Sequence, residues 1–386
     1  MANEILTPKI IAREALMRLK SNMVMPELVH RDYEQEFRAV GDTVDIRVPA
    51  TYTVDEFENT INLQDNIEGK VPLKMDIHAD ISTEVTSKEL ALDIDRFNER
   101  FLSGMVLAMS EFIDTKIAEK AAKGIGDYVG TAGETPDTLK KGFGDPRLAL
   151  NRKRVPQANR NVVFDPDAES ELGMLDVLTK ANESGGTQGL REAFMGRVKG
   201  FNTYMDQNIA THKAGSYTVL EDAEVVDVEH DQENYNVSIL QFESTAGDDE
   251  ELVAGDLFEV EGEKYVVISD TSQATGGTLN NVKVSPQFHV DDETDLDDDS
   301  VTFADQSARG HVSNLAFHQN SIALVNAPLL PPQGGVDAYT AQDPESGLAI
   351  RVVWGYDQQT KKEMLSLDTL FGTKVIFPEL GVQVLG

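Results

Sequence analysis

The sequence predicts an α+β protein with an inserted β domain, and three features support this fold class. Apolar residues recur every four positions within residues 93–123, which is typical of a long helix. Residues 43–92 change to β character around a wide polar stretch. Residues 216–310 hold 25 acidic and 3 basic side chains, and so carry −22 of the net charge of −33. Because the mixture of helical and strand patterns seen before this segment resumes after residue 311, we expect residues 213–311 to be an inserted domain.

The composition narrows the class of protein. The chain has 386 residues, 40% of them hydrophobic, and no cysteine, so a sizeable core is expected and disulfides are excluded. The acidic excess repels nucleic acids and anionic membranes. The start, Met1 to Glu4, lacks the features of a secretory signal, and no apolar run is long enough to span a bilayer. We therefore expect a soluble protein made and kept in a cytoplasm, with no membrane partner.

Residues 1–42 are predicted to form an N-terminal arm with a helix. Thr7 and Pro8 suit an N-cap followed by proline at the first helical position. Ile11, Ala15 and Leu19 then follow at helical spacing, and the helix is expected to end before Pro26.

Residues 43–92 are predicted to form one long β hairpin with a polar tip. Leu73, Met75 and Ile77 alternate with polar residues, which is the period of a strand with one buried face. A two-stranded hairpin is marginal in water by itself. Since nothing adjacent in sequence supplies a partner face, the hairpin is a first indication of assembly with other chains.

Residues 93–123 are predicted to form the longest helix, about 40 Å in length. Its apolar stripe is interpreted as core packing and consists of Phe97, Phe101, Met105, Met109, Ile113 and Ile117. Residues 124–212 mix both structures: a short buried strand at Val162–Phe164 leads into a helix near Pro166, and another strand is expected at Phe201–Met205.

Residues 213–311 contain short predicted strands separated by turns. Glu261 and Gly262 lie between two runs in which apolar and polar residues alternate, as in a β hairpin. Residues 312–386 return to the main body, and its last segments, near residues 348–357 and 372–386, are expected to be buried strands.

The sequence shows no recognisable catalytic motif. Gly124-Ile125-Gly126 follows a predicted helix rather than a strand, and is better explained as a helix stop than as a dinucleotide fingerprint. Phosphate-binding loops, nucleophile elbows and zinc-protease pairs are missing. The seven histidines are scattered; His311 and His318 could share a helix face, but no acidic ligand pair lies nearby in sequence. We expect no catalytic residue, cofactor or metal, and hence no enzyme.

Two charged clusters are candidate contact sites. Seven carboxylates lie within nine positions, too many to be buried without partners, and they are Asp291, Asp292, Glu293, Asp295, Asp297, Asp298 and Asp299. They would suit a calcium ion, but the glycine that an EF-hand loop needs at its sixth position is missing. The one concentrated basic cluster contains Arg152, Lys153 and Arg154, followed by Arg160. We expect the acidic loop to be wet or to meet such a basic surface on another subunit.

The order of these parts resembles the major capsid proteins of tailed bacteriophages, which have the Hong Kong 97-type fold. "VGDTVDIRVPATYTVDEFENTINLQDNIEGKVPLKMD" is similar to their extended loop, and "TSKELALDIDRFNERFL" to the start of their spine helix. "GFNTYMDQNI" looks like the strand before an insertion, and "AGDLFEVEGEKYVV" like a hairpin within it. "NLAFHQNSIALVNAPLLPP" and "LFGTKVIFPELGVQV" look like closing segments. The inserted domain resembles the small β barrel of one coat-protein branch. The resemblance covers nearly the whole chain.

The resemblance implies a domain plan and a function. It divides the chain into an arm (1–42), an extended hairpin loop (43–92), a spine helix (93–123), an axial domain (124–212), the inserted β barrel (213–311) and a return to the axial and peripheral domains (312–386). It implies hexamers and pentamers of an icosahedral virion shell, assembled in the host bacterial cytoplasm with scaffolding and portal proteins. The shell would enclose double-stranded DNA without sequence-specific binding. Whether a decoration protein takes part stays open.

Two other classes of protein also stay open at this stage. One is the shell protein of a bacterial nanocompartment, which has the same fold but encloses protein cargo. The other is a calcium-dependent binding protein that does not assemble.

Overall fold

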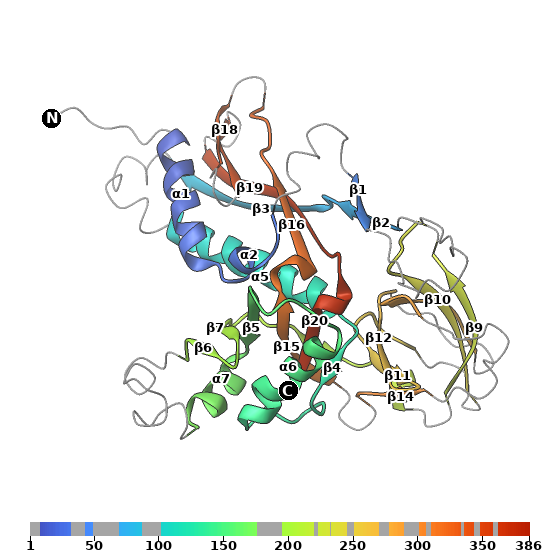
Figure 1. Cartoon of the computed structure of the whole chain (residues 1–386). Helices are drawn as coiled ribbons and strands as arrows, with labels where there is room; N and C mark the ends of the chain where they lie inside the picture. The colour runs from blue at the N-terminus through green and yellow to red at the C-terminus, as the bar shows by residue number, and fades with distance from the viewer. Residues whose placement is uncertain are drawn as a thin grey trace, which may run out of the picture.

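The computed structural model describes residues 8–31, 43–48, 69–86, 102–175, 195–219, 223–231, 233–244, 251–269, 278–288, 301–305, 310–332, 336–342, 348–357 and 362–386. Figure 1 shows three regions: a sheet covered by helices, a mixed α/β part, and a strand-rich part beside them. Within the described chain the α-helices all lie before residue 174, and strands make up most of the rest, so the structure is a strand-rich α+β fold, as predicted. No helix within the described residues is long and apolar enough to cross a membrane.

The first sheet is built around one long strand, β19 (Lys362–Val375). On one side β19 pairs with β18 (Ala349–Asp357) and β16 (Ile322–Ala327), and β17 (Asp337–Gln342) extends the sheet from β18. Against β19 also lies β3 (Ile77–Thr86), antiparallel over ten residue pairs. A sheet made from both ends of the chain therefore joins segments nearly 300 residues apart.

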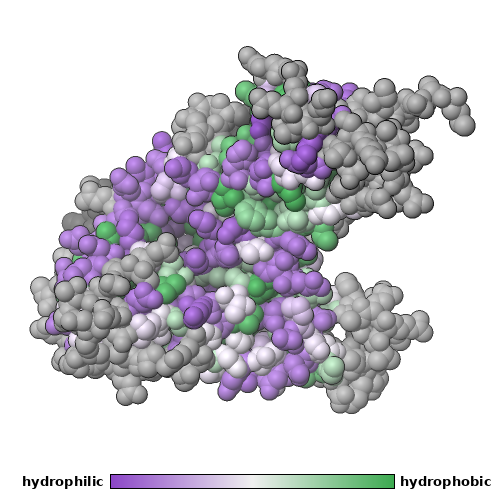
Figure 2. Space-filling model, turned by 180° about the vertical axis from the view of Figure 1, so that it is seen from behind, coloured by the Kyte–Doolittle hydropathy of each residue, from purple (hydrophilic) through white to green (hydrophobic). Residues whose placement is uncertain are grey.

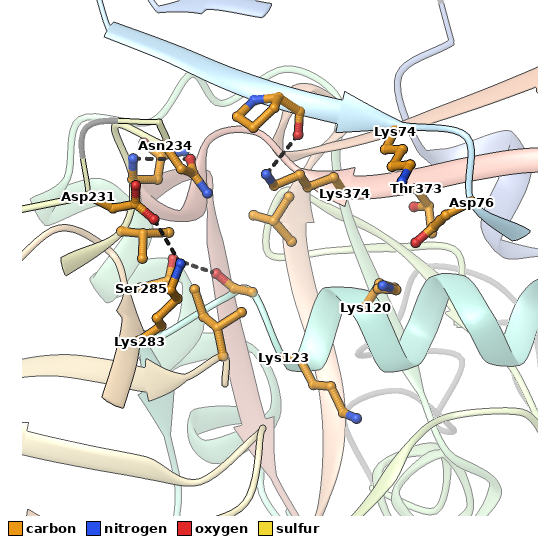
Figure 3. Close-up of a pocket in the computed structure, with 16 residues that line it drawn as sticks. Lys74, Asp76, Lys120, Lys123, Asp231, Asn234, Lys283, Ser285, Thr373 and Lys374 are labelled. Atoms are coloured by element: carbon orange, nitrogen blue, oxygen red, sulfur yellow. Dashed lines mark hydrogen bonds and ion pairs between the residues drawn. The ribbon is translucent and has the colours of Figure 1, made fainter. Parts of the chain in front are cut away.

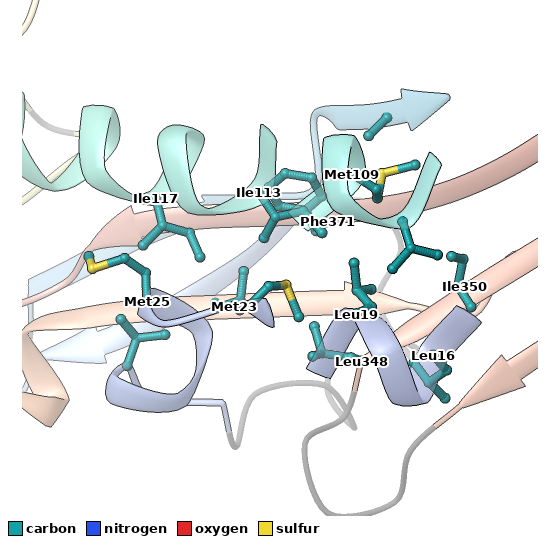
Figure 4. Close-up of a cluster of buried hydrophobic side chains, with 14 of the residues drawn as sticks. Leu16, Leu19, Met23, Met25, Met109, Ile113, Ile117, Leu348, Ile350 and Phe371 are labelled. Atoms are coloured by element: carbon teal, nitrogen blue, oxygen red, sulfur yellow. The ribbon is translucent and has the colours of Figure 1, made fainter. Parts of the chain in front are cut away.

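Helices α1 (Pro8–Asn22), α2 (Met25–Leu28) and α5 (Ser103–Ala122) bury their apolar faces against this sheet. Figure 4 shows α5 above the sheet, with Ile113 beside Phe371 of β19 and Leu19 below them. The three side chains are at most 1% exposed and belong to one continuous core. Burial of Ile11, Ala15 and Leu19 confirms the predicted stripe of α1.

The predicted spine helix is confirmed over the described residues. Met105, Met109, Ile113 and Ile117 are all buried at the expected spacing of four. Phe97 and Phe101, the first members of the stripe, lie outside the described residues. The helix ends at Ala122 and the chain then turns at Gly124, which agrees with the interpretation of Gly124-Ile125-Gly126 as a helix stop.

A buried carboxylate fixes the arm to the spine helix. Asp114 of α5 is 1% exposed, and its two carboxylate oxygens accept hydrogen bonds from the backbone N–H groups of Val24 and Met25, both 3.2 Å long. Burial, with a smaller contribution from the nearby carboxylate of Asp206, raises the pKa of Asp114 to about 7, against the lowering effect of the two backbone donors.

The hairpin differs from the expectation in two ways. Strands β1 (Thr43–Val48) and β2 (Gly69–Lys74) do pair, antiparallel from Thr43–Lys74 to Val48–Gly69. However, the chain leaves the hairpin after β2, because β3 joins β19 instead. The apolar face of β1 and β2 is also covered within the chain: Val44, Ile46, Val71 and Leu73 pack with Ala323, Val325 and Ile376. The prediction of a hairpin without a partner face was therefore wrong for its base. Residues 49–68, between the strands, lie outside the described residues.

The second sheet forms the middle of the molecule. Its strand order is β4 (Tyr128–Val129), β20 (Gly381–Leu385), β15 (Gly310–His318), β5 (Arg160–Phe164), β7 (Phe201–Met205) and β6 (Arg197–Val198), with β8 (Thr211–Lys213) also paired to β15. A π-helical turn at Lys140–Gly144 leads into α6 (Asp145–Arg152), and α7 (Pro166–Gly173) follows β5. The strand, helix and strand predicted at Val162–Phe164, Pro166 and Phe201–Met205 are thus confirmed.

A third, six-stranded sheet lies wholly within the segment predicted to be inserted. Its order is β14 (Thr302–Phe303), β11 (Leu257–Val260), β12 (Glu263–Val267), β13 (Thr278–Ser285), β10 (Ser238–Glu243) and β9 (Glu224–His230). A core of its own, centred on Tyr217, Phe242 and Phe258, fills one side. Glu261 and Gly262 form the expected turn with φ of 50° and 88°. The six domain boundaries, and the closure of this sheet into a barrel, stay predictions.

Replacing Ile113 by alanine should destabilise the protein strongly. The side chain is 1% exposed, and such truncations cost about 2–5 kcal/mol in a packed core. Leu107, on the outer face of the same helix and 48% exposed, is the matched control and should cost less than about 1 kcal/mol when changed to alanine. Guanidinium unfolding of the two variants measures this difference, and equal losses would contradict the assigned face.

Asp114→Asn should remove a pH dependence of stability. Since the pKa is raised from 3.8 to about 7, the native state keeps a proton that the unfolded state loses, and the stabilisation from it is lost as pH rises from about 4 to 7. The difference in unfolding free energy between variant and wild type should shift in the variant's favour by up to about 4 kcal/mol over this range. The amide oxygen accepts only one of the two backbone bonds, but that loss is independent of pH.

Unfolding curves at several pH values between about 4 and 7.5 provide the measurement for Asp114→Asn. Glu111→Gln, an exposed change on the same helix, is the control and should retain the wild-type dependence. Parallel pH profiles for wild type and Asp114→Asn would contradict the assignment.

Candidate functional site

The two charged clusters predicted as contact sites are only partly visible. The acidic residues 291–299 lie outside the described residues. Arg152, Lys153 and Arg154 are exposed at the end of α6, and Lys153 forms an ion pair with Asp127, with Nζ and Oδ2 3.0 Å apart. Arg160 is 2% exposed and donates to the backbone carbonyls of Pro156 and Val155, so it does not belong to a surface cluster. The exposed part of this predicted basic cluster therefore consists of Arg152, Lys153 and Arg154.

A second group of cations, which the sequence analysis missed, surrounds a cavity of about 340 Å³. Its lining comes from the hairpin base, the end of α5, strand β19 and the inserted sheet, and includes Lys74, Lys120, Lys123, Lys283 and Lys374. Figure 3 shows Lys120 and Lys123 on the last turns of α5, with Lys374 and Lys283 on other walls. Asp76 and Asp231 are the acidic lining residues, so the cavity is basic in a strongly acidic chain.

The lysines of this cavity have different environments. Lys283 forms an ion pair with Asp231, with Nζ and Oδ2 3.1 Å apart. The Nζ of Lys374 donates to the carbonyl of Pro72 at 2.8 Å, which ties β19 to the hairpin base. Burial, with a smaller contribution from the positive charge of Lys120, lowers the pKa of Lys374 to about 8.

The cavity can accept an anionic group and also joins three parts of the fold. Asn236 of the inserted segment donates to the carbonyl of Ile376, and Ser285 donates to the carbonyl of Gly124 at the end of the spine helix, both across this junction. Converging ammonium groups suit a carboxylate or a phosphate. Its position means that a bound anion would bridge hairpin, spine and insertion.

A third cluster lies where the inserted segment joins the body, and we call it the neck cluster: His212, Asp256, Asp305 and His311. His212 Nε2 lies 2.7 Å from Asp256 Oδ1, and His311 Nδ1 lies 2.8 Å from Asp305 Oδ2. The four side chains are each at most 9% exposed. His311 and His318 lie on strand β15, which excludes the possibility that they share a helix face.

Strand register assembles the neck cluster. His212 and His311 are cross-strand partners of β8 and β15, the strands that enter and leave the inserted segment. Asp256 precedes β11 and Asp305 follows β14, and these two strands pair as well. No spacing signal marks this cluster in the sequence, because its members are spread over 100 positions and only long-range pairing brings them together.

Comparison with known proteins finds a likeness in structure alone. The chain matches no family of proteins and no curated protein. A chain from Mycobacterium phage Che8 is 16% identical, and the alignment covers 94% of this chain and 90% of that chain with a TM-score of 0.52. A chain from the mature capsid of bacteriophage PhiM1 is 11% identical, with 89% and 82% covered and a TM-score of 0.47. A chain from the capsid of Ralstonia phage GP4 is 7% identical, with 100% and 93% covered and a TM-score of 0.43.

The similarity to the Che8 chain concerns the fold, and it spans almost the entire length of both chains. The predicted α+β fold class is therefore confirmed, and the chain has the fold of this phage Che8 chain.

Lys374→Met should abolish a rise in stability at alkaline pH. The lysine has a pKa of about 8 in the folded protein and 10.5 as its ordinary value. Between these values the unfolded state binds a proton that the native state lacks, so wild-type stability rises with pH relative to the variant, by up to about 3 kcal/mol.

Unfolding free energies of wild type and Lys374→Met at about pH 7.5 and 10 test this expectation. Lys70→Met is the matched control, since Lys70 is a half-exposed lysine of the same hairpin, and its difference from wild type should stay constant with pH. If the difference in unfolding free energy between Lys374→Met and wild type were also independent of pH, burial would not lower the pKa of Lys374.

Proposed function

We propose that the chain is the major capsid protein of a tailed bacteriophage, a structural subunit that assembles with copies of itself into the icosahedral head shell. The observation that carries this proposal is the fold likeness to the chain from Mycobacterium phage Che8 over 94% of the length. From this likeness, together with the sequence resemblance to phage major capsid proteins, we infer a structural role rather than an enzymatic one.

The molecular surface supports assembly. Large apolar side chains are exposed on separate elements, among them Leu107 on α5, Met205 on β7 and Met364 on β19. Figure 2 shows apolar groups gathered around a hollow on one side of the molecule. Apolar surface of this kind commonly marks a protein–protein contact. Strand β17 also forms an edge of the first sheet, within the described residues.

The charge of the chain suits a wall around packaged DNA. A net charge of −33 repels a polyanion over most of the surface, so the shell can enclose double-stranded DNA without binding its sequence. A shell that adhered strongly to DNA would hinder both its packing and its release.

The proposal includes partners and a place of assembly. Hexamers and pentamers would form in the host bacterial cytoplasm on a scaffolding protein, around a portal, and the product would be the virion capsid. The acidic residues 291–299 would contact Arg152, Lys153 and Arg154 of a neighbouring subunit. Such exposed pairs are worth about 0–1 kcal/mol each, but a shell repeats them many times.

Replacing residues 49–68 by an Asn-Gly turn should abolish assembly and leave the subunit folded. Val48 and Gly69 are paired, so a two-residue turn can close the hairpin directly. The base keeps its own core of Val44, Ile46, Val71 and Leu73, and hence its stability. Negative-stain microscopy and sedimentation, with the scaffolding protein present, should show shells for wild type and none for the variant.

A second variant, with residues 49–68 replaced by Gly and Ser at equal length, separates sequence from length and should also fail to form shells. Normal shells from both variants would contradict the role of the hairpin in assembly. A wild-type chain that remains a monomer, and whose melting temperature depends on millimolar calcium, would instead favour a calcium-dependent binding protein. Native particles that contain protein cargo and no DNA would favour a nanocompartment.

A further inference from the structure

The neck cluster combines buried charge with ligand geometry. Asp256 and Asp305 are both 0% exposed, and two histidines face them. One imidazole nitrogen of His212 and one carboxylate oxygen from each aspartate lie within 4.8 Å of one another. Ligand atoms that share one zinc-type ion at about 2.1 Å are about 3.4 Å apart in a tetrahedral site, so a small contraction would suffice.

The two aspartates are not equally satisfied by protein donors. Asp256 accepts hydrogen bonds from the backbone N–H groups of Gly215 and Val253 as well as facing His212. Asp305 has His311 Nδ1 as its one hydrogen-bond partner among the described residues. A fully buried carboxylate with a single donor needs a positive charge nearby.

His311 is poorly placed to provide that charge. Its Nε2 is buried and has no hydrogen-bond partner within the described part of the chain. A doubly protonated His311 would therefore bury an N–H donor without an acceptor, which is unfavourable. A neutral His311 that donates from Nδ1 leaves Asp305 without a balancing charge from this partner. A divalent cation held between the two aspartates would balance their buried charge.

We propose that His212, Asp256 and Asp305 bind a divalent metal ion of the zinc class, and that His311 positions Asp305 for it. Imidazole with carboxylate is a ligand set that zinc, cobalt and manganese accept, whereas calcium prefers six to eight oxygens. A carboxylate ligand fixed by a hydrogen bond from a histidine is a usual outer-shell arrangement. The site does not depend on the proposed capsid function.

Two glycines leave the space that His212 occupies in this site. A Cβ at Gly255 would lie 2.7 Å from His212 Nδ1, and a Cβ at Gly310 would lie 2.6 Å from the carbonyl oxygen of His212. Both glycines have positive φ, of 115° and 154°. The metal would join the body, through His212 of β8, to the inserted sheet, through Asp256 and Asp305. It would thus set the orientation of the insertion.

The test uses the purified full-length chain, stripped with a chelator and titrated with zinc chloride by calorimetry. We expect one tight site per chain and a rise in melting temperature on binding. Cobalt chloride should give the visible absorption of a low-coordinate cobalt site. Asp305→Asn and His212→Gln, both close in size to the native residues, should abolish the tight site. His311→Gln should weaken it about 10–100-fold, as expected for a positioning residue.

His230→Gln is the matched control, because His230 is an exposed histidine of the same inserted sheet and should be neutral. Circular dichroism checks that each variant is folded. Absence of a one-to-one tight site in the wild type would overturn the proposal. So would tight binding that survives both Asp305→Asn and His212→Gln, since the metal would then bind elsewhere on this acidic chain.

Discussion

Packing of strand β19 against helix α5, with helix α1 on the neighbouring strands β17 and β18, holds the rest of the structure in place. β19 is the one strand among the described elements that pairs with three others of the first sheet, and those come from residues 77–86, 322–327 and 349–357. The same strand supplies Leu365, Leu367 and Phe371 to the main core. Close approach at Gly372, where a Cβ would collide with the carbonyl of Lys74, lets the hairpin base cross it. The arm, spine and hairpin are therefore placed by a strand near the C-terminus.

Local pattern predicted most of the individual elements. The four-residue stripe located the spine helix, alternation located β2 and the start of β3, and the Glu261-Gly262 pair located a turn, because each depends on neighbours a few positions away. The resemblance to phage capsid proteins supplied the global fold class. Partners distant in sequence could not be predicted. The pairing of β3 with β19 was missed, and with it the internal cover of the hairpin base, because no local period encodes which strand a strand joins.

The candidate sites show the same difference between local features, which could be predicted from the sequence, and long-range contacts, which could not. Runs of like charge, such as 291–299 and 152–154, are visible in sequence, whereas clusters formed by long-range register are not. The five lysines of the central cavity come from four places in the fold, and the neck cluster comes from two pairs of neighbouring strands. Both clusters lie where the inserted sheet meets the body. The junction thus holds two groups of charged side chains, and it links the acidic insertion to the spine and hairpin that we propose carry assembly.

Electron cryomicroscopy of the full-length chain, assembled with its scaffolding protein, can show whether this chain is a shell subunit. We expect closed icosahedral particles in which each subunit keeps the α5–β19 core, and in which residues 49–68 of one subunit lie against the next. A chain that stays a folded 42.4 kDa monomer under all assembly conditions would rule out the proposed shell.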